Sequence, residues 1–436
     1  MSRSDRIIKK IVSWAMGAIY RRVEVRQQEG FTTSGPQLAN ASHFGGFSDP
    51  LVLAYAMDRV PRFIARDVIW RFAPARWVMN WVGAIPVHKP EDKGTGTTND
   101  QMFASTYAAL QEGELVAIFP EGITVDTPQI ASIKTGSARI ALGARASGVE
   151  GLTLISAGIH YTNKAALRSE VFVDIGWPID LDASIDDFVP EGASDAPSDH
   201  AAVNALTDTM EANLRRAAPN FEDWSTAHSL AAAAEVALRP VESSDSSVHQ
   251  GDRERLASML EASDEQVAVV QAMDRYQTDL DAMGFTDAML IRGLSKLSAF
   301  TWYVVRTVVI ALLLLPFAVI GIVVNVIPMV TVWLVGRLKV EDAMMATIKP
   351  LGALAVFSIT WGVWLWVAFR RGGPESLAAM FLLLPVYLFA LIAWFERMTL
   401  LFRAVRGFAR SRSVKDVYET IWSHRTAVVE AVAQAL

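Results

Sequence analysis

The sequence predicts an α/β protein in which a mixed sheet flanked by helices precedes a helical connector and a C-terminal transmembrane helical region. Three observations carry this prediction. Short apolar runs alternate with helix-favouring stretches up to about residue 180. An acidic segment rich in Ala and Ser follows, to about residue 281. Three long runs without a charged residue come after residue 301.

Composition excludes several classes of protein. The 436 residues include no cysteine, which rules out disulfides, thiolate metal sites and a cysteine nucleophile. The net charge is −6, because 40 Lys+Arg stand against 46 Asp+Glu. Nucleic-acid affinity comes largely from phosphate neutralisation, so we expect no nucleic-acid partner. The histidines show no metal-ligand spacing, and we expect no metal site.

Compact apolar runs predict the strands, and each has a histidine or a charged residue at or beside one end. The runs are Leu38–Ser42, Val82–Lys89, Glu114–Phe119, Leu152–Tyr161 and Val171–Ile175. Helices are expected between them, at Pro50–Met57, Asn99–Gln111 and Ser137–Ala146. Because α/β folds place ligand-contacting residues at strand ends, the charged residues are site candidates. A solvated surface position is the alternative interpretation of each one.

Residues 1–28 predict a basic amphipathic helix. Its apolar positions from Ile7 to Ile19 share a face, and residues 1–27 carry seven Lys/Arg against two acids. Such a helix suits an anionic lipid surface, and an ordinary packed helix is the alternative. We then expect the α/β domain at 29–235, the helical connector at 236–299, the transmembrane region at 300–401 and a C-terminal cytoplasmic helix at 402–436.

The charge-free runs are Thr307–Gly336, Pro350–Phe369 and Ser376–Phe395, each long enough to cross a bilayer of about 30 Å. The first contains two prolines and forms either a kinked span or a hairpin, so we expect three to four spans, or a hairpin plus two spans. Arginines are densest after the last run, which places that end on the cytoplasmic face of the membrane. We favour the hairpin for the first run, because the number of crossings is then even and the α/β domain lies on the cytoplasmic face too.

The segment His43-Phe-Gly-Gly-Phe-Ser-Asp49 follows the first predicted strand. Its two glycines allow a tight turn that brings the imidazole toward the carboxylate. A histidine beside a carboxylate is a general base held in one tautomer. A chance spacing is the alternative, because His and Asp are six positions apart in many proteins.

Four ordered blocks between about residues 30 and 180 resemble the glycerolipid acyltransferase family, the 1-acylglycerol-3-phosphate and glycerol-3-phosphate acyltransferases. The spacing of five residues between His43 and Asp49, followed by Pro50, resembles that of the family's fungal-type branch. The blocks are His43–Pro50, Gly83–Lys89, Phe119-Pro-Glu-Gly122 with Lys134-Thr-Gly136, and Ser156–Tyr161. Lys89 stands where the family has arginine, and Thr124-Val125 stand where relatives often carry Ser and His.

The resemblance implies that His43 deprotonates an acceptor hydroxyl while Asp49 orients its ring. It further implies substrate binding by Lys89, Glu121, Gly122, Lys134 and Arg168. Backbone N–H groups near Gly45 and Gly46 are candidates for stabilising the oxyanion. No bound cofactor is implied; acyl-CoA or acyl-ACP (acyl carrier protein) is the acyl-donor substrate.

The function expected from these features is that of an integral membrane enzyme that acylates 1-acylglycerol 3-phosphate to form phosphatidic acid in phospholipid biosynthesis. Membrane lipids and the acyl donor are its expected partners. One alternative is a glycerol-3-phosphate 1-O-acyltransferase. A further alternative is a non-catalytic lipid transporter or membrane scaffold.

Overall fold

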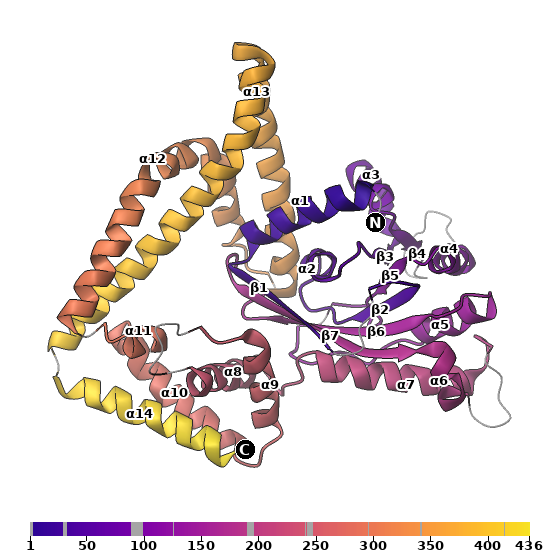
Figure 1. Cartoon of the computed structure of the whole chain (residues 1–436), viewed down its shortest axis with the longest axis horizontal. Helices are drawn as coiled ribbons and strands as arrows, with labels where there is room; N and C mark the ends of the chain where they lie inside the picture. Colours follow the sequence, from indigo (N-terminus) through magenta and orange to yellow (C-terminus); the bar gives the residue numbers. More distant parts are fainter. Residues whose placement is uncertain are drawn as a thin grey trace. The chain divides into compact units, whose positions relative to one another are not determined.

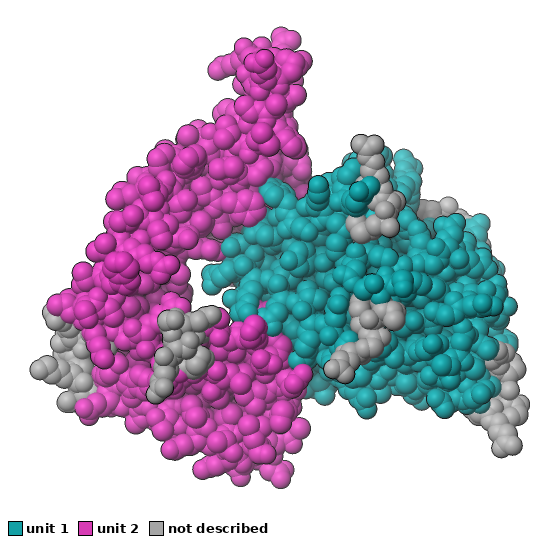
Figure 2. All heavy atoms as spheres, viewed as in Figure 1, with its two compact units in different colours: residues 1–222, 340–347 teal, residues 223–339, 348–436 magenta. Residues whose placement is uncertain are grey.

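The computed structural model of the chain describes residues 3–28, 33–88, 99–124, 126–189, 196–239, 241, 247–294, 296–340, 342–413 and 415–436. It contains two compact units (Figure 2), residues 1–222 with 340–347 and residues 223–339 with 348–436. The division after residue 222 falls inside the range predicted for the α/β domain, 29–235.

Unit 1 carries the sheet. Its elements are α1 (Arg3–Ile19), β1 (Arg22–Gln27), β2 (Gln37–Ala41), α2 (Ser48–Ala56), β3 (Arg62–Arg66), η1 (Asp67–Arg71), α3 (Ala73–Trp81), β4 (Ile85–Val87), α4 (Asn99–Gln111), β5 (Leu115–Ile118), α5 (Gly136–Ala146), β6 (Thr153–Tyr161), β7 (Glu170–Asp180), α6 (Leu181–Phe188) and α7 (His200–Ala217).

The seven strands form one mixed sheet in the order β1-β7-β6-β2-β5-β3-β4. Only β6 and β7 pair antiparallel; the other neighbours are parallel. Helices α1 and α2 lie on one face, and α5 and α7 on the other (Figure 1). The predicted mixed sheet flanked by helices is confirmed.

The central strands are buried because helices cover both faces. All five residues of β2 are buried, and β5 and β6 are almost entirely buried. Their sequences are short apolar runs without strict alternation, as expected for a sheet covered on both sides. Since β2, β5, β3 and β4 run parallel, their carboxyl ends meet at one edge of the sheet, where α/β folds place their sites.

The N-terminal segment differs from the single helix predicted over 1–28. The helix α1 ends at Ile19, and the next segment forms β1, which pairs with β7 because its alternating residues suit a sheet edge. The apolar side of α1 is also divided. Ile8 and Val12 pack into the core, whereas Ile7 and Ile11 are exposed. Packing against the α/β domain therefore buries only part of the apolar side of α1 that was predicted to face lipid.

Unit 2 is helical, which agrees in kind with the predicted connector and membrane region. Its elements are α8 (Trp224–Leu238), α9 (Gln250–Glu261), α10 (Gln266–Met283), α11 (Asp287–Ile291), α12 (Leu297–Val335), α13 (Asp342–Ser413), which begins in unit 1, and α14 (Lys415–Gln434). Tyr276 and Arg425 both donate hydrogen bonds to the buried carboxylate of Asp287, which ties α10, α11 and α14 together.

In the part of the chain that the structure describes, two helices are long and apolar enough to cross a membrane, within Leu297–Val335 and Met344–Arg410. The second is interrupted, because Gly372 and Gly373 have non-helical backbone angles that divide α13 into two arms. Figure 1 shows these arms meeting at a turn. The three charge-free runs of the sequence thus lie in α12 and in the two arms of α13.

Candidate active site

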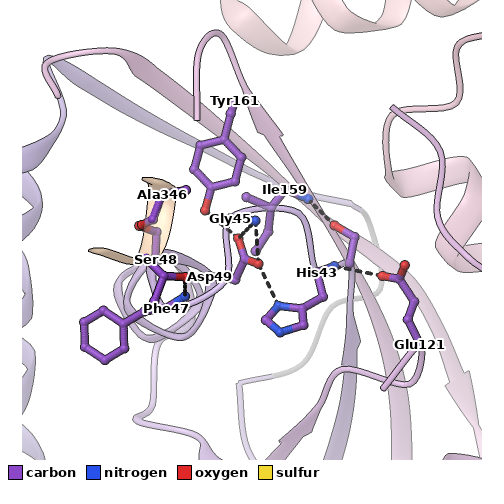
Figure 3. Close-up of polar contacts among 11 residues, drawn as sticks. His43, Gly45, Phe47, Ser48, Asp49, Glu121, Ile159, Tyr161 and Ala346 are labelled. Carbon is purple, nitrogen blue, oxygen red and sulfur yellow. Dashed lines mark hydrogen bonds and ion pairs between the residues drawn. The ribbon is translucent and has the colours of Figure 1, made fainter. Parts of the chain in front are cut away.

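The loop that follows β2 brings His43 and Asp49 together. The chain turns through Gly45 and Gly46, and α2 then begins at Ser48, so that Asp49 lies in its first turn. The Nδ1 atom of His43 is 2.8 Å from Oδ2 of Asp49 (Figure 3). The approach expected from the two glycines is present, and it forms a hydrogen-bonded pair.

Asp49 is fully buried and has three hydrogen-bond donors. Besides His43, the backbone N–H of Gly45 donates to both carboxylate oxygens, at 2.9 and 3.1 Å, and the hydroxyl of Tyr161 donates to Oδ1 at 2.6 Å. A Cβ at Gly45 would lie 2.8 Å from both Asp49 Oδ1 and the Tyr161 oxygen. The loop therefore requires glycine at this position. These donors compensate for removing a carboxylate from water.

Tyr161 can act only as a donor to Asp49. Burial, and then the Asp49 charge, raise the pKa of Tyr161 well above its ordinary value near 10. Tyr20, whose ring centroid is 6.1 Å from that of Tyr161, has a pKa raised to about 12, chiefly by burial. Both phenols therefore remain protonated at physiological pH, and Tyr161 fixes the position of Oδ1.

The His43 ring is held on two sides. Its Nδ1–H donates to Asp49, which leaves Nε2 as the proton acceptor in the neutral ring. The imidazole stacks on Phe119 with ring centroids 4.4 Å apart. Its side chain is 20% exposed. A partly exposed imidazole whose tautomer is fixed by a carboxylate is equipped to accept a proton from a hydroxyl.

Glu121 follows β5 and holds the backbone of the site. Its Oε1 accepts the N–H of His43 at 2.8 Å, and its Oε2 accepts the N–H of Ala131 at 2.9 Å. The side chain is buried, and this burial raises its pKa from 4.5 to about 7. Glu121 thus links the histidine loop to the 126–135 segment. Both of its hydrogen bonds are to backbone N–H groups, and neither supports the predicted contact with substrate.

Lys134 lies over the glycine that follows Glu121. A Cβ at Gly122, which has a φ of +67°, would be 3.0 Å from the Lys134 Nζ. The Lys134 N–H donates to the Pro120 carbonyl, which fixes the backbone beneath the side chain. Lys134 is exposed. The structure therefore brings one of the predicted cations to the segment after β5, over a glycine three residues beyond Phe119, whose ring stacks on His43.

The other predicted cations are placed differently. The Arg168 guanidinium donates to the carbonyls of Gly17 and Tyr20 at 2.7 and 2.6 Å. It thereby closes the C-terminal end of α1, where a cation is favourable. These bonds give Arg168 a structural role, and none of them supports the predicted contact with substrate. Lys89 lies outside the described residues.

The two oxyanion candidates also differ. The N–H of Gly45 donates to the Asp49 carboxylate, so this donor is already used within the loop. Gly46 lies in the turn with a φ of +57°. Its role at an oxyanion stays a prediction.

Two contacts that the sequence did not predict hold the start of α2. The Ser48 hydroxyl donates to the Ala346 carbonyl at 3.1 Å, and the Phe47 N–H donates to the Thr347 hydroxyl at 3.2 Å. Both partners belong to the part of α13 that lies in unit 1. Nothing local in the sequence indicates a pairing across 300 positions. Tyr161, by contrast, ends a block that the sequence singled out.

Among the described residues, no group of three or more His, Asp or Glu side chains is arranged to hold a metal ion. Two further histidines of unit 1, His160 and His88, have structural partners. The His160 Nε2 faces the Ala217 carbonyl at 2.7 Å, and His88 Nδ1 lies 3.1 Å from the buried carboxylate of Asp67.

Comparisons with known proteins agree with the sequence blocks. Residues 22–159 match the family model described as Acyltransferase. Glycerol-3-phosphate O-acyltransferase 2 of Saccharomyces cerevisiae is 30% identical over 129 residues, which cover 29% of this chain and 17% of the yeast protein. The chain thus matches about a sixth of that relative's length.

Among solved structures, the 1-acyl-sn-glycerophosphate (LPA) acyltransferase of Thermotoga maritima is similar with a TM-score of 0.34 and 18% identity. The match covers 48% of this chain and 77% of the Thermotoga chain. The family model and the yeast relative agree with the resemblance to the glycerolipid acyltransferases that the sequence blocks predicted.

Proposed function

We propose that this protein is a membrane-bound O-acyltransferase that transfers a fatty acyl group from a thioester to 1-acylglycerol 3-phosphate, forming phosphatidic acid. The observation that carries the proposal is the 2.8 Å pair of His43 and Asp49 inside an acyltransferase-family domain. An imidazole held in one tautomer by a buried carboxylate is suited to activate a hydroxyl.

In the proposed reaction, His43 Nε2 takes the proton of the acceptor hydroxyl as its oxygen attacks the thioester carbonyl. The tetrahedral intermediate collapses, the carbon–sulfur bond breaks, and the departing thiolate takes the proton from the imidazolium. Asp49 keeps its hydrogen bonds throughout and stabilises the imidazolium. General-base catalysis of this kind contributes roughly 10²–10⁴-fold. The thioester is acyl-CoA or acyl-ACP, and no covalent acyl-enzyme is needed.

The phosphate of the acceptor requires a cation, and Lys134 is the described residue best placed to supply it. Its ammonium lies over Gly122, beside the segment that carries Glu121. Lys89 remains a second proposed contact. An ammonium binds phosphate as a point charge, so two lysines supply attraction without the paired geometry of an arginine.

The long apolar helices fit a substrate that resides in a bilayer. Helices α12 and α13 are proposed to anchor the enzyme, with the acyltransferase domain at the cytoplasmic face, where the arginines after the last apolar run are retained. The acceptor and the product both partition into membranes, so anchoring keeps the enzyme at their surface.

The yeast relative favours a second candidate acceptor, because its name specifies glycerol 3-phosphate. The five residues between His43 and Asp49 point the same way. Supplying purified protein in vesicles with radiolabelled acyl-CoA and each acceptor separates the two. Labelled phosphatidic acid from 1-acylglycerol 3-phosphate supports the first candidate. Label only in 1-acylglycerol 3-phosphate supports the second.

A further inference from the structure

The helix α3 directs its apolar stripe outward. Pro74, Trp77, Val78 and Trp81 occupy positions i, i+3, i+4 and i+7, the spacing of one helix face. All four are exposed, with Trp77 at 67%. An amphipathic helix ordinarily buries such a stripe against its own domain.

The opposite side of α3 provides the contact with unit 1. Ala75 and Met79 are partly buried, and no residue of the helix is fully buried. Figure 1 shows α3 at the periphery of this unit. The indole N–H of Trp70 donates to the Asn80 side chain at 2.8 Å, which holds the helix to the preceding turn. The outward orientation of the stripe is therefore a property of the fold.

Three exposed aromatic rings lie on α3 and at its start. Trp77 and Trp81 stack with ring centroids 5.8 Å apart, and Phe72, at the start of the helix, is 67% exposed. We name Phe72, Trp77, Val78 and Trp81 the α3 face. Isolated exposed apolar residues are common on proteins, but a stacked pair with two further apolar neighbours marks a contact surface.

The exposed charges carried by α3 and the residue just before Phe72 are positive. Arg71 and Arg76 are exposed on either side of Phe72, and the sequence contains no acid between Asp67 and Glu91. The Asp67 carboxylate is buried and faces His88. Tryptophan favours the headgroup level of a bilayer, and arginine favours anionic lipids.

We infer that the α3 face docks on the surface of a bilayer that contains anionic lipids. The same chain carries two helices suited to cross a membrane, so this surface is present at high local concentration. A second copy of the chain is the less favoured occupant, because a two-fold contact through this small patch brings Arg71 and Arg76 near their counterparts.

The α3 face lies on a crossover between two parallel strands. The turn η1 begins at the carboxyl end of β3, the sheet edge near the candidate base, and α3 then runs back to the start of β4. The carbonyl of Val82, just after α3, accepts a hydrogen bond from Arg62 at the start of β3. Trp81 therefore lies toward the amino ends of these strands, and the α3 face docks the domain without contacting the candidate base.

The absence of cysteine permits a direct test in the full chain. Spin labels are attached to single-cysteine variants W77C and V78C in proteoliposomes of phosphatidylcholine with about a third phosphatidylglycerol. The control is E150C, an exposed position in the turn after α5. We expect labels at 77 and 78 to be more accessible to oxygen than to a water-soluble nickel relaxant, and the label at 150 to show the reverse.

Two outcomes overturn the inference. One is a label at position 77 that is as accessible to the nickel relaxant as the control. The other is a sharp short spin–spin distance between labels at 77 of two copies, which assigns the face to self-association. The double variant W77S/W81S provides a second measurement. We expect it to raise the KM for acceptor in anionic vesicles by about fivefold or more and to leave turnover in detergent micelles unchanged. An equal loss of activity in vesicles and in micelles contradicts the inference.

Discussion

The hydroxyl of Tyr161 donates a 2.6 Å hydrogen bond to Oδ1 of Asp49, on the carboxylate whose other oxygen faces His43. Tyr161 is the last residue of β6, and Asp49 lies in the first turn of α2. The bond therefore fixes the helix that carries the carboxylate against the strand next to β2. The orientation of the candidate base depends on this tertiary contact as well as on the local turn.

Replacement of Tyr161 by Phe removes the hydroxyl and keeps the ring. Asp49 then has one donor fewer, and the helix that carries it is held less firmly against β6, so the His43 ring is oriented less well. We expect a loss in kcat of about tenfold, from one hydrogen bond to a charged group. The control is Y107F, at a half-buried tyrosine that packs near Gly143. A kcat for Y161F equal to that of the wild-type protein would argue that Tyr161 is only a packing residue.

Glu121 gives the domain a pH dependence of defined sign. Its pKa is raised in the folded state, from 4.5 to about 7. Its contribution to the free energy of unfolding is therefore fully present below pH 4.5 and is lost as pH rises through 7. The loss approaches about 3 kcal/mol at most, because each pKa unit corresponds to about 1.4 kcal/mol.

The variant E121Q does not titrate at this position. At pH 5 we expect E121Q to have a lower thermal midpoint than the wild-type protein, because an amide offers only one acceptor oxygen to two N–H groups. Between pH 5 and pH 8 its midpoint should rise relative to that of the wild-type protein, which loses the contribution of Glu121. Differential scanning fluorimetry in detergent at several pH values measures this. A constant difference across the range contradicts the raised pKa.

Lys134 is expected to affect acceptor binding. K134A removes the ammonium over Gly122 and should raise the KM for the phosphate-bearing acceptor by about tenfold, with kcat changed less, because the cation attracts ground state and transition state alike. K134R should recover part of the loss. The matched control is R139A, one turn into α5, where the guanidinium lies over the Phe103 ring. Equal KM values for K134A and wild type would assign the phosphate to other cations.

Arg168 is expected to affect stability. R168A removes two hydrogen bonds to the end of α1 and should lower the free energy of unfolding by about 2 kcal/mol. The KM for acceptor should not change in the protein that remains folded. A thermal midpoint equal to that of wild type together with a raised KM would return Arg168 to the substrate site.

Much of the sheet is predictable because each buried strand is a compact apolar run. The run Leu152–Tyr161 corresponds to β6, and the predicted helix Asn99–Gln111 coincides with α4. The strand β1 was missed because its charged residues suited the preceding amphipathic helix. The helix α3 was missed because its apolar residues face solvent and do not pack into the core, so they did not stand out as a core-facing helix.

The candidate site is predictable where it is local. His43, its two glycines and Asp49 lie within seven residues, so sequence spacing implies their approach. The contacts that orient them are long-range: Tyr161 is 112 positions from Asp49, and Thr347 is 300 positions from Phe47. Arg168 shows the converse, since a cation near a strand end is also suited to close a helix, and only the tertiary structure distinguishes these roles.

The measurement that tests the central proposal most directly is acyl transfer by purified protein in vesicles, with radiolabelled acyl-CoA and 1-acylglycerol 3-phosphate. H43A is compared with H200A, which alters an exposed histidine at the start of α7. We predict labelled phosphatidic acid from wild type and H200A, and a decrease of about 10²-fold or more for H43A. Full turnover by H43A would contradict the assignment of His43 as the base, and no transfer by the wild-type protein to either glycerol phosphate acceptor would contradict the proposed function.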